Sequence, residues 1–302
     1  MKIGIIGLGK MGYNIALNLI SHNHTVVAND VNQENVKSII KDGAIGVDSK
    51  KKLIEELSTN DRKVIWLMVP AGKPVDFVIY EILPMLSEGD IIIDGGNSNY
   101  KATLIRYEEL KKHGVHLLDC GTSGGISGAL EGVCTMIGGD KEIFEYCEPI
   151  FRDISVKDGY LYTGKTGSGH FVKMIHNGIE YGMMQAMAEG FEVLHKSNYD
   201  IDYGKVSKLW NNGSVIQGCL MELMEQAFLK DKNLDEIKGI INSSGEAKWT
   251  VETALDLEVP VPVISMSLFM RYRSLEEDTF AGKVVSVLRN GFGGHDVIKA
   301  EK

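Results

Sequence analysis

A stripe of polar side chains in the second half of the sequence carries groups suited to acid–base chemistry. Its members are His170, Lys173, His176, Asn177, Glu180 and Tyr181. Each lies three or four residues from another member. At roughly 100° per residue these positions share one face of a helix that we expect over residues 167–196. Apolar residues occupy much of the remaining circumference, and polar groups on a buried helix are costly unless they pair with each other or with a ligand. We therefore interpret the stripe as a candidate catalytic face, with a solvated surface as the alternative.

Lys173 and Glu180 are the candidate base and acid of this face. They are separated by two turns, about 10 Å along the helix axis, which is enough to bracket a small substrate. One group can act as a base at one carbon while the other acts as an acid at another. Burial lowers the pKa of a lysine, so that its neutral amine becomes accessible near neutral pH. The sequence has no two-histidine metal motif and no aspartate cluster, which favours a mechanism without a metal.

Two glycine-containing segments follow predicted strands and could contact ligands. Residues 121–128 are too glycine-rich for a helix or core strand, and we expect their backbone N–H groups and the Ser123 hydroxyl to cradle a carboxylate or phosphate. A merely flexible loop is the alternative. In the segment Asp94-Gly95-Gly96-Asn97-Ser98, Asn97 could bind a ribose or a substrate hydroxyl, or could only form an Asx turn.

The N-terminal segment predicts a dinucleotide site. The run Gly7-Leu8-Gly9-Lys10-Met11-Gly12 lies between a predicted strand and a predicted helix, as a pyrophosphate-binding turn requires. Asp30, 18 residues after Gly12, can bind an adenosine ribose but would repel a 2′-phosphate, and Val31 supplies no cation. These residues favour NAD over NADP. Val69-Pro70-Ala71 follows another strand on the same ligand side of the sheet.

Apolar strands and amphipathic helices alternate in the first half of the chain. We expect strands at 2–7, 25–29, 63–69, 90–94 and 115–119, with helices at 11–21, 33–41, 74–86 and 101–113 between them. This pattern predicts an α/β domain with a doubly wound parallel (Rossmann) sheet over residues 1–163. Residues 164–302 are expected to form an all-helical substrate and oligomerisation domain, with further helices at 203–211, 217–229, 247–257 and 274–289. The tail 295–302 is expected to have no regular structure.

Composition excludes several classes of protein. The 302 residues carry 41 acidic and 32 basic side chains, a balance that argues against binding nucleic acid through a basic surface. Neither an apolar run of the ~20 residues needed to span a bilayer nor a signal peptide is recognisable. The four cysteines match no metal-binding pattern. We therefore expect a cytoplasmic protein with reduced thiols.

Three motifs beyond the nucleotide turn carry a family resemblance. They are Gly95-Gly96-Asn97-Ser98, Thr122-Ser123-Gly124-Gly125, and the run 169–181 that ends His-Asn-Gly-Ile-Glu-Tyr. Together the motifs resemble decarboxylating 6-phosphogluconate dehydrogenases, in a short form, within the β-hydroxyacid dehydrogenase superfamily. Near the end, Arg289 and His295 resemble a phosphate-binding arginine and a substrate histidine that family members contribute to the neighbouring subunit. The resemblance thus implies a homodimer or homotetramer with shared active sites, and a role in pentose phosphate metabolism or gluconate utilisation.

The resemblance also implies roles for individual residues. Lys173 and Glu180 would be catalytic, and the substrate would be bound by Asn97, Ser123, Gly124, Gly125, His176, Asn177, Tyr181, Arg289 and His295. At two positions where longer family members have phosphate ligands this chain has Ser244 and Glu246, so those ligands are not carried over. Arg271 or Arg273 could supply a further arginine. A non-decarboxylating β-hydroxyacid dehydrogenase is the main alternative, and an NAD-binding regulator without catalysis is a second.

Overall fold

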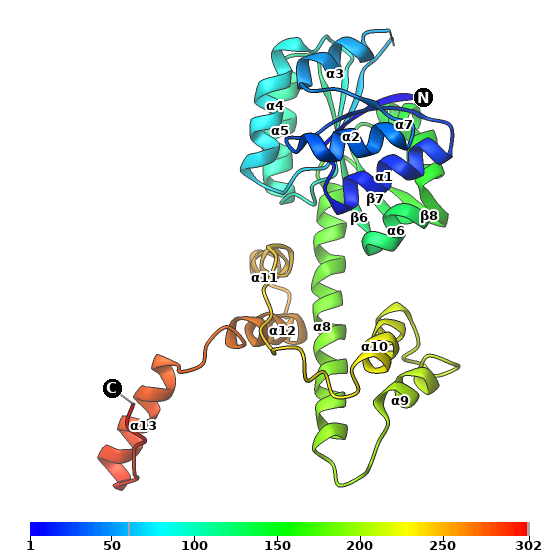
Figure 1. The fold of residues 1–302 in the computed structure, drawn as a ribbon. Coiled ribbons are helices and arrows are strands. Elements are labelled where there is room, and N and C mark those ends of the chain that lie inside the picture. The colour runs from blue at the N-terminus through cyan, green and yellow to red at the C-terminus, as the bar shows by residue number, and fades with distance from the viewer. Residues whose placement is uncertain (60, 301–302) are drawn as a thin grey trace. The chain divides into compact units, whose positions relative to one another are not determined.

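The computed structural model describes residues 1–59 and 61–300, and its first half is built on one eight-stranded sheet (Figure 1). The strand order is β3-β2-β1-β4-β5-β6-β7-β8. The strands are β1 (Lys2–Ile6), β2 (Thr25–Asn29), β3 (Ile45–Gly46), β4 (Val64–Leu67), β5 (Ile91–Asp94), β6 (His116–Ser123), β7 (Val133–Gly138) and β8 (Ser155–Gly164). Every neighbouring pair is parallel except β6 and β7. The predicted doubly wound sheet is therefore confirmed.

Helices cover both faces of this sheet. They are α1 (Lys10–Ser21), α2 (Gln33–Lys41), α3 (Lys50–Leu57), α4 (Lys73–Ile82), the 3-10 turn η1 (Leu83–Met85), α5 (Tyr100–Lys111), α6 (Gly125–Glu131) and α7 (Lys141–Ile154). Consecutive residues of a strand belong to separate hydrophobic cores on the two faces of the sheet. Trp66 packs with α1 and α7, whereas Ile65 packs with α3 and α4. Burial on both faces explains why the strands are almost continuously apolar.

Two details of the sheet differ from the prediction. The antiparallel β6–β7 pair was not expected, nor were β3, α3, β7, α7 and β8 as elements. The segment expected to be irregular at 121–128 is instead regular, because Gly121 to Ser123 extend β6 and Gly125 to Gly128 lie in α6. The reason is close packing: a methyl group on Gly121 would lie 2.3 Å from Cβ of Lys173. Glycine is needed there for contact between elements, and the strand does not break.

The second half is helical in the described residues, as predicted. Its helices are α8 (Ser168–Lys196), α9 (Tyr203–Trp210), α10 (Cys219–Lys230), α11 (Glu246–Asp256), α12 (Pro262–Arg273) and α13 (Phe280–Gly293). The helix predicted at 274–289 is wrong in its first turns, because residues 274–279 join α12 to α13 and the Thr279 side chain caps α13. Residues 295–300 form no helix or strand, and the last two residues of the predicted tail lie outside the described residues.

The chain forms two compact units, Met1–Asn177 and Gly178–Lys302, and α8 is a continuous helix that passes from one into the other. The boundary expected after residue 163 stays a prediction; β8 ends at Gly164 and α8 begins at Ser168. No helix within the described ranges is long and apolar enough to cross a bilayer.

Candidate active site

The glycine turn between β1 and α1 has the geometry of a pyrophosphate site. Gly7 has φ of +103°, and a methyl group on Gly12 would lie 2.1 Å from the Gly7 carbonyl oxygen, so both positions require glycine. A methyl group on Gly9 would meet no atom within 4 Å, which leaves this side of the turn open. Beside the turn lies a groove of about 590 Å³ lined by Leu8, Gly9, Lys10, Tyr13, Asn14, Asn35 and Ile126. The groove lies at the start of α1, where the unpaired N–H groups of a helix N-terminus favour an anion such as a pyrophosphate.

Asp30, the residue expected to bind the ribose, is fixed at this turn. Its carboxylate accepts a hydrogen bond from Leu8 N at 2.5 Å and another from Asn32 N at 2.6 Å. Val31 beside it is 95% exposed and uncharged. Met11 lies in the first turn of α1, and residues 69–71 follow β4 at the same end of the sheet.

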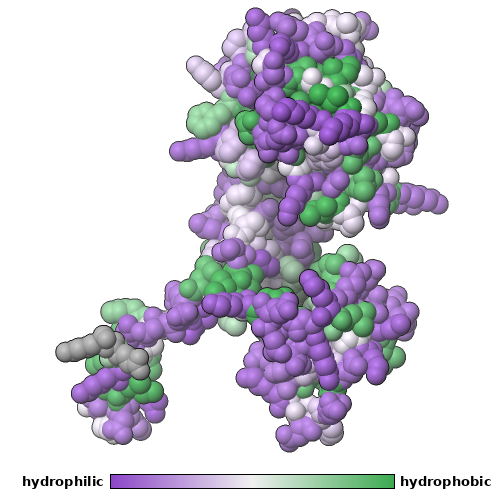
Figure 2. All heavy atoms as spheres, viewed as in Figure 1, coloured by the Kyte–Doolittle hydropathy of each residue, from purple (hydrophilic) through white to green (hydrophobic). Residues whose placement is uncertain are grey.

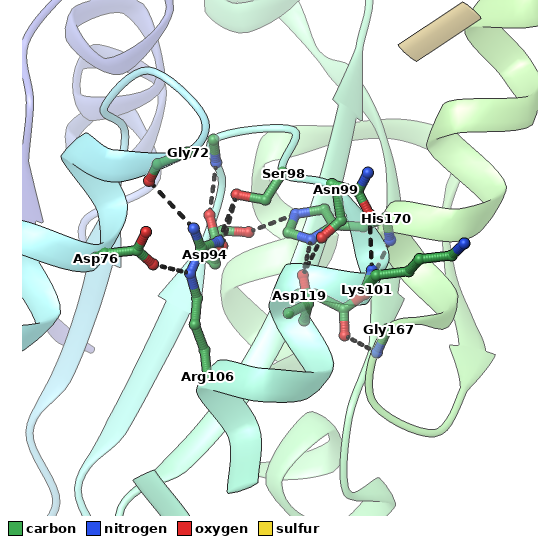
Figure 3. Close-up of polar contacts among 12 residues, drawn as sticks. Gly72, Asp76, Asp94, Ser98, Asn99, Lys101, Arg106, Asp119, Gly167 and His170 are labelled. Carbon is green, nitrogen blue, oxygen red and sulfur yellow. Dashed lines mark hydrogen bonds and ion pairs between the residues drawn. The ribbon is translucent and has the colours of Figure 1, made fainter. Parts of the chain in front are cut away.

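The loop after β5 is held by a buried charge network (Figure 3). Asp94 is fully buried, and its carboxylate accepts hydrogen bonds from Gly96 N, the Ser98 hydroxyl and Arg106. Arg106 also binds Asp76 at 2.7 Å. Because a buried carboxylate needs such partners, the network determines the conformation of the loop.

Asn97, predicted to bind a ribose or substrate hydroxyl, lies in this loop with φ of +51°. Its side-chain oxygen accepts from Thr122 N at 3.0 Å, and its amide nitrogen donates to Thr122 O at 3.4 Å. Asn97 thereby joins the loop after β5 to the end of β6, next to Ser123.

Lys173 is placed by the N-terminus of α8. The fully buried Asp119 of β6 accepts hydrogen bonds from Gly167 N at 2.7 Å and His170 N at 2.8 Å, so a carboxylate caps the positive end of the helix. One turn later Lys173 is only 5% exposed. The polar face of this part of α8 is therefore turned into the protein, and the alternative of a solvated face does not hold for His170 and Lys173.

Four of the predicted residues form one hydrogen-bonded group at Lys173. The His176 ring lies with Nε2 3.2 Å from the Ser123 hydroxyl and with Nδ1 3.0 Å from Asn177 Oδ1. Nδ1 is also 3.5 Å from Lys173 Nζ. The amine therefore lies among groups that can orient hydroxyls and carry protons.

Beside this group Gly124 and Gly125 have consecutive positive φ values of +119° and +65° at the start of α6. The segment is thus a tight turn between β6 and α6 rather than a long loop, and backbone N–H groups in a turn can bind an anion. Its role in holding a carboxylate stays a prediction.

The second compact unit holds a separate group around Tyr181. Glu180 is partly buried, and Tyr181 is 5% exposed with its hydroxyl 3.0 Å from Ser244 Oγ and accepting from Ser244 N. The Arg271 guanidinium lies 3.4 Å above the Tyr181 ring. Arg273 instead donates to the Glu276 carbonyl. Of the two arginines that the sequence left open, Arg271 is the one that lies at Tyr181.

Comparison with known proteins assigns the family. A family model described as the NAD binding domain of 6-phosphogluconate dehydrogenase matches residues 2–164, and one for the C-terminal domain of 6-phosphogluconate dehydrogenase matches residues 169–290. The chain belongs to the 6-phosphogluconate dehydrogenase family. It is accordingly an oxidoreductase with a pyridine-nucleotide-binding domain.

The chain matches members of this family that have its own length and members that are longer. It is 58% identical to YqeC of Bacillus subtilis over 98% of both chains, a protein whose own assignment to this enzyme is provisional. It is 41% identical over the full length of both chains to an NAD(+)-dependent, decarboxylating 6-phosphogluconate dehydrogenase of Haloferax volcanii. The Plasmodium falciparum 6-phosphogluconate dehydrogenase, described with NADP+ and with substrate, has a TM-score of 0.82 at 30% identity, covering 99% of this chain and 66% of the other.

The two remaining site residues predicted from the 6-phosphogluconate dehydrogenase resemblance lie at the end of the chain. Arg289 is on α13, and His295 follows that helix; both are exposed. Within the described residues no hydrogen bond or ion pair joins them to Tyr181 or Ser244. The substrate-binding roles predicted for Arg289 and His295 stay predictions.

Sequence reasoning missed several residues that support the site. Asp119, Thr103 and Arg106 are buried polar residues whose partners lie far away in the chain, so no local spacing marks them. Only Asp119 offered a signal, because it ends a mostly apolar strand, where a polar residue needs a partner. Thr103 and Arg106 lie on α5 among other polar residues, so nothing in the sequence distinguishes them.

Proposed function

We propose that this protein oxidatively decarboxylates 6-phospho-D-gluconate to ribulose 5-phosphate and CO2, with NAD as the hydride acceptor. The observation that carries the proposal is the environment of Lys173. Its amine is buried and lies within the hydrogen-bonded group of His176, Asn177 and Ser123, next to the glycine turn at the start of α6.

NAD, when bound, accepts the hydride that leaves the substrate. Gly7 to Gly12 and the adjacent groove would hold its pyrophosphate, and Asp30 would receive its ribose hydroxyls. The preference for NAD over NADP is supported by charge. A 2′-phosphate would approach the Asp30 carboxylate, and the exposed Val31 offers no positive charge in compensation.

Lys173 is the proposed base for the oxidation. Burial favours the neutral form of an amine, which can then take the proton of the C3 hydroxyl as the C3 hydride departs. The product is a 3-keto acid, whose C1–C2 bond breaks to release CO2 and leaves the bonding electrons in an enediolate. The ammonium of Lys173 stabilises the developing oxyanion.

Glu180 is the proposed acid for the last step. It lies two turns beyond Lys173 on the unbroken helix α8, about 10 Å along the axis. Its carboxyl group would deliver a proton to the former C2 of the enediol, which becomes C1 of ribulose 5-phosphate. The anion-holding turn at Gly124 and Gly125 would bind the carboxylate before it leaves as CO2.

The phosphate end of the substrate would be held by Tyr181 and Arg271, completed by Arg289 and His295 of a second copy. Arginine suits this dianion because its planar fork offers paired donors. The shared arrangement is supported by α13, because none of its residues is buried in this chain although several are apolar. Phe280, Val287 and Phe292 are each more than 60% exposed. Figure 2 shows hydrophobic side chains at the surface of this helix. An apolar cavity of about 540 Å³ lined by residues of α8, α9 and α10 is a surface that a second copy could cover.

Turnover of substrate labelled with ¹³C at C1 tests the proposal. We expect NADH and labelled CO2 in equal amounts, and faster turnover with NAD than with NADP. NADH without CO2 would favour a non-decarboxylating hydroxyacid dehydrogenase, and a panel of unphosphorylated hydroxy acids would then identify its substrate class.

A further inference from the structure

We propose that His170 is a positioning residue that fixes the loop carrying Asn97 against the helix carrying Lys173. It lies one turn before Lys173 on α8 and is 1% exposed, so it does not reach a ligand itself. The effect on catalysis rests on the proposed function, because it assumes that Lys173 is the base. The effect on the position of the loop is independent of the proposed function.

Both ring nitrogens of His170 contact the segment around the loop after β5 (Figure 3). Nε2 lies 3.1 Å from the Asp94 carbonyl oxygen, at the last residue of β5. Nδ1 lies 2.8 Å from the Thr103 hydroxyl, in the first turns of α5. One side chain of α8 therefore contacts the residues on either side of the 95–99 loop.

The chemistry of the partners fixes the direction of each hydrogen bond. A carbonyl oxygen can only accept, so Nε2 of His170 carries the proton and donates to Asp94. In the neutral ring Nδ1 is then an acceptor, and the Thr103 hydroxyl donates to it. Thr103 and Asp94 are fully buried, so each contact with the His170 ring is made away from water. The Thr103 hydroxyl also lies 3.3 Å from the Asn99 carbonyl oxygen, and loss of the ring would leave it with that partner alone.

Hydrogen bonds hold the 95–99 loop in one conformation, so a contact at its ends affects the position of Asn97. The Asp94 carboxylate holds Gly96 N and Ser98, and the Asn97 side chain is paired with the backbone of Thr122. The start of α8 is in turn held by the Asp119 carboxylate. The side-chain hydrogen bonds of His170 join the start of α8 to the residues that flank the 95–99 loop. They therefore help to set the distance between Asn97 and Lys173. A misplacement of about 1 Å in such a site costs rate more than affinity.

Two substitutions separate the two hydrogen bonds. In His170→Gln the side-chain amide nitrogen can take the place of Nε2 and still donate to the Asp94 carbonyl oxygen. The shorter side chain of His170→Asn reaches only the place of Nδ1, so it can keep the hydrogen bond to Thr103 but loses the one to Asp94. We expect His170→Asn to lower kcat by about 10- to 100-fold, the range for a misplaced catalytic group, and His170→Gln to retain most of it. NAD affinity, measured by fluorescence without substrate, is expected to stay within about twofold in both variants.

A primary isotope effect with substrate deuterated at C3 distinguishes positioning from a loss of folding. It should increase in His170→Asn, because hydride transfer is the step that is slowed. Thr103→Val tests the other hydrogen bond, because it removes the partner of Nδ1 at nearly constant volume and leaves the contact with Asp94. It should therefore retain most of kcat, as His170→Gln does, with Thr103→Ser as its matched control. If His170→Asn does not fold, a loss of 10-fold or more in kcat in both His170→Gln and Thr103→Val would overturn the proposal. Equal kcat in the Asn, Gln and unmodified enzymes would overturn the proposal. So would parallel losses of kcat and NAD affinity in all variants.

Crystal structures test the role of His170 separately from the proposed reaction. If the unmodified protein does not oxidise 6-phosphogluconate, the proposed function fails, and the structures of the unmodified and His170→Asn proteins still decide the role of His170. A displaced 95–99 loop in the variant would support it. A loop that superposes on that of the unmodified protein would refute it.

Discussion

Replacement of Gly121 by alanine tests how closely β6 and α8 must approach to place Lys173. The added methyl group would lie 2.3 Å from Cβ and 2.9 Å from Cγ of Lys173, and 3.0 Å from the Gly169 carbonyl oxygen. Carbon atoms pack at about 3.5 Å or more, so the two elements must separate by about 1 Å at this point. Gly121 is paired with Met136 of β7, and the next residue, Thr122, is held by the Asn97 side chain, so we expect the movement to fall mainly on α8.

The expected result for Gly121→Ala follows from that displacement. Overpacking of this kind costs about 1–3 kcal/mol in the free energy of unfolding. A catalytic group moved by about 1 Å costs on the order of 100-fold in kcat. NAD affinity should be unchanged, because the glycine turn at Gly7 lies at another strand.

The assay compares kcat from NADH formation, NAD affinity from fluorescence and the urea midpoint of unfolding. Gly128→Ala is the matched control, since a methyl group there meets nothing within 4 Å and the residue lies in the helix α6. We expect this control to keep kcat within about twofold, as for other open surface positions. A Gly121→Ala enzyme with the same kcat as the control would show that the reasoning about close approach is wrong.

Four further outcomes are expected. Lys173→Met should bind NAD normally but lose nearly all hydride transfer, which single-turnover NADH formation measures. Glu180→Gln should slow ribulose 5-phosphate formation more than NADH formation, by about 10²-fold for loss of a general acid, and a product assay beside the NADH trace checks this. Val31→Arg should raise kcat/KM with NADP relative to NAD, because it adds a cation where the chain has an exposed apolar residue; an unchanged ratio would contradict the assigned ribose site. Burial lowers the pKa of His24 below its ordinary value, although its hydrogen bond to Asp153 opposes this. The unfolded state therefore binds more protons, so this contribution to stability is complete above about pH 6.5 and is lost as the pH falls below it. Urea midpoints at about pH 7.5 and 5.5 should differ less in His24→Gln than in the unmodified protein, and an equal difference would exclude His24 as the cause.

The fold was predictable where local pattern reflects burial. Strands covered on both faces are apolar throughout, and the glycine turn requires its residue types for steric reasons. The antiparallel direction of β7 was not predicted, because it depends on how the chain returns to the sheet after α6 and not on the residues of the strand alone. The helix α12 was missed because apolar residues occur all around it, without the one-sided spacing that identifies a surface helix.

The candidate site was predictable along α8 and not across the chain. Helical spacing alone brought Lys173, His176 and Asn177 to one face, and the structure adds Ser123 to the same hydrogen-bonded group. The choice of Arg271 over Arg273 depends on which residue lies over a tyrosine 90 positions earlier. Such information is held in tertiary packing and not in local sequence.

The unbroken course of α8 has a mechanical consequence. Within one continuous helix the rise per residue sets the distance along the axis between Lys173 and Glu180. Insertion or deletion of one residue between them would turn Glu180 by about 100° away from the face that carries Lys173. The length of this segment is therefore more strictly constrained than the identity of the residues within it.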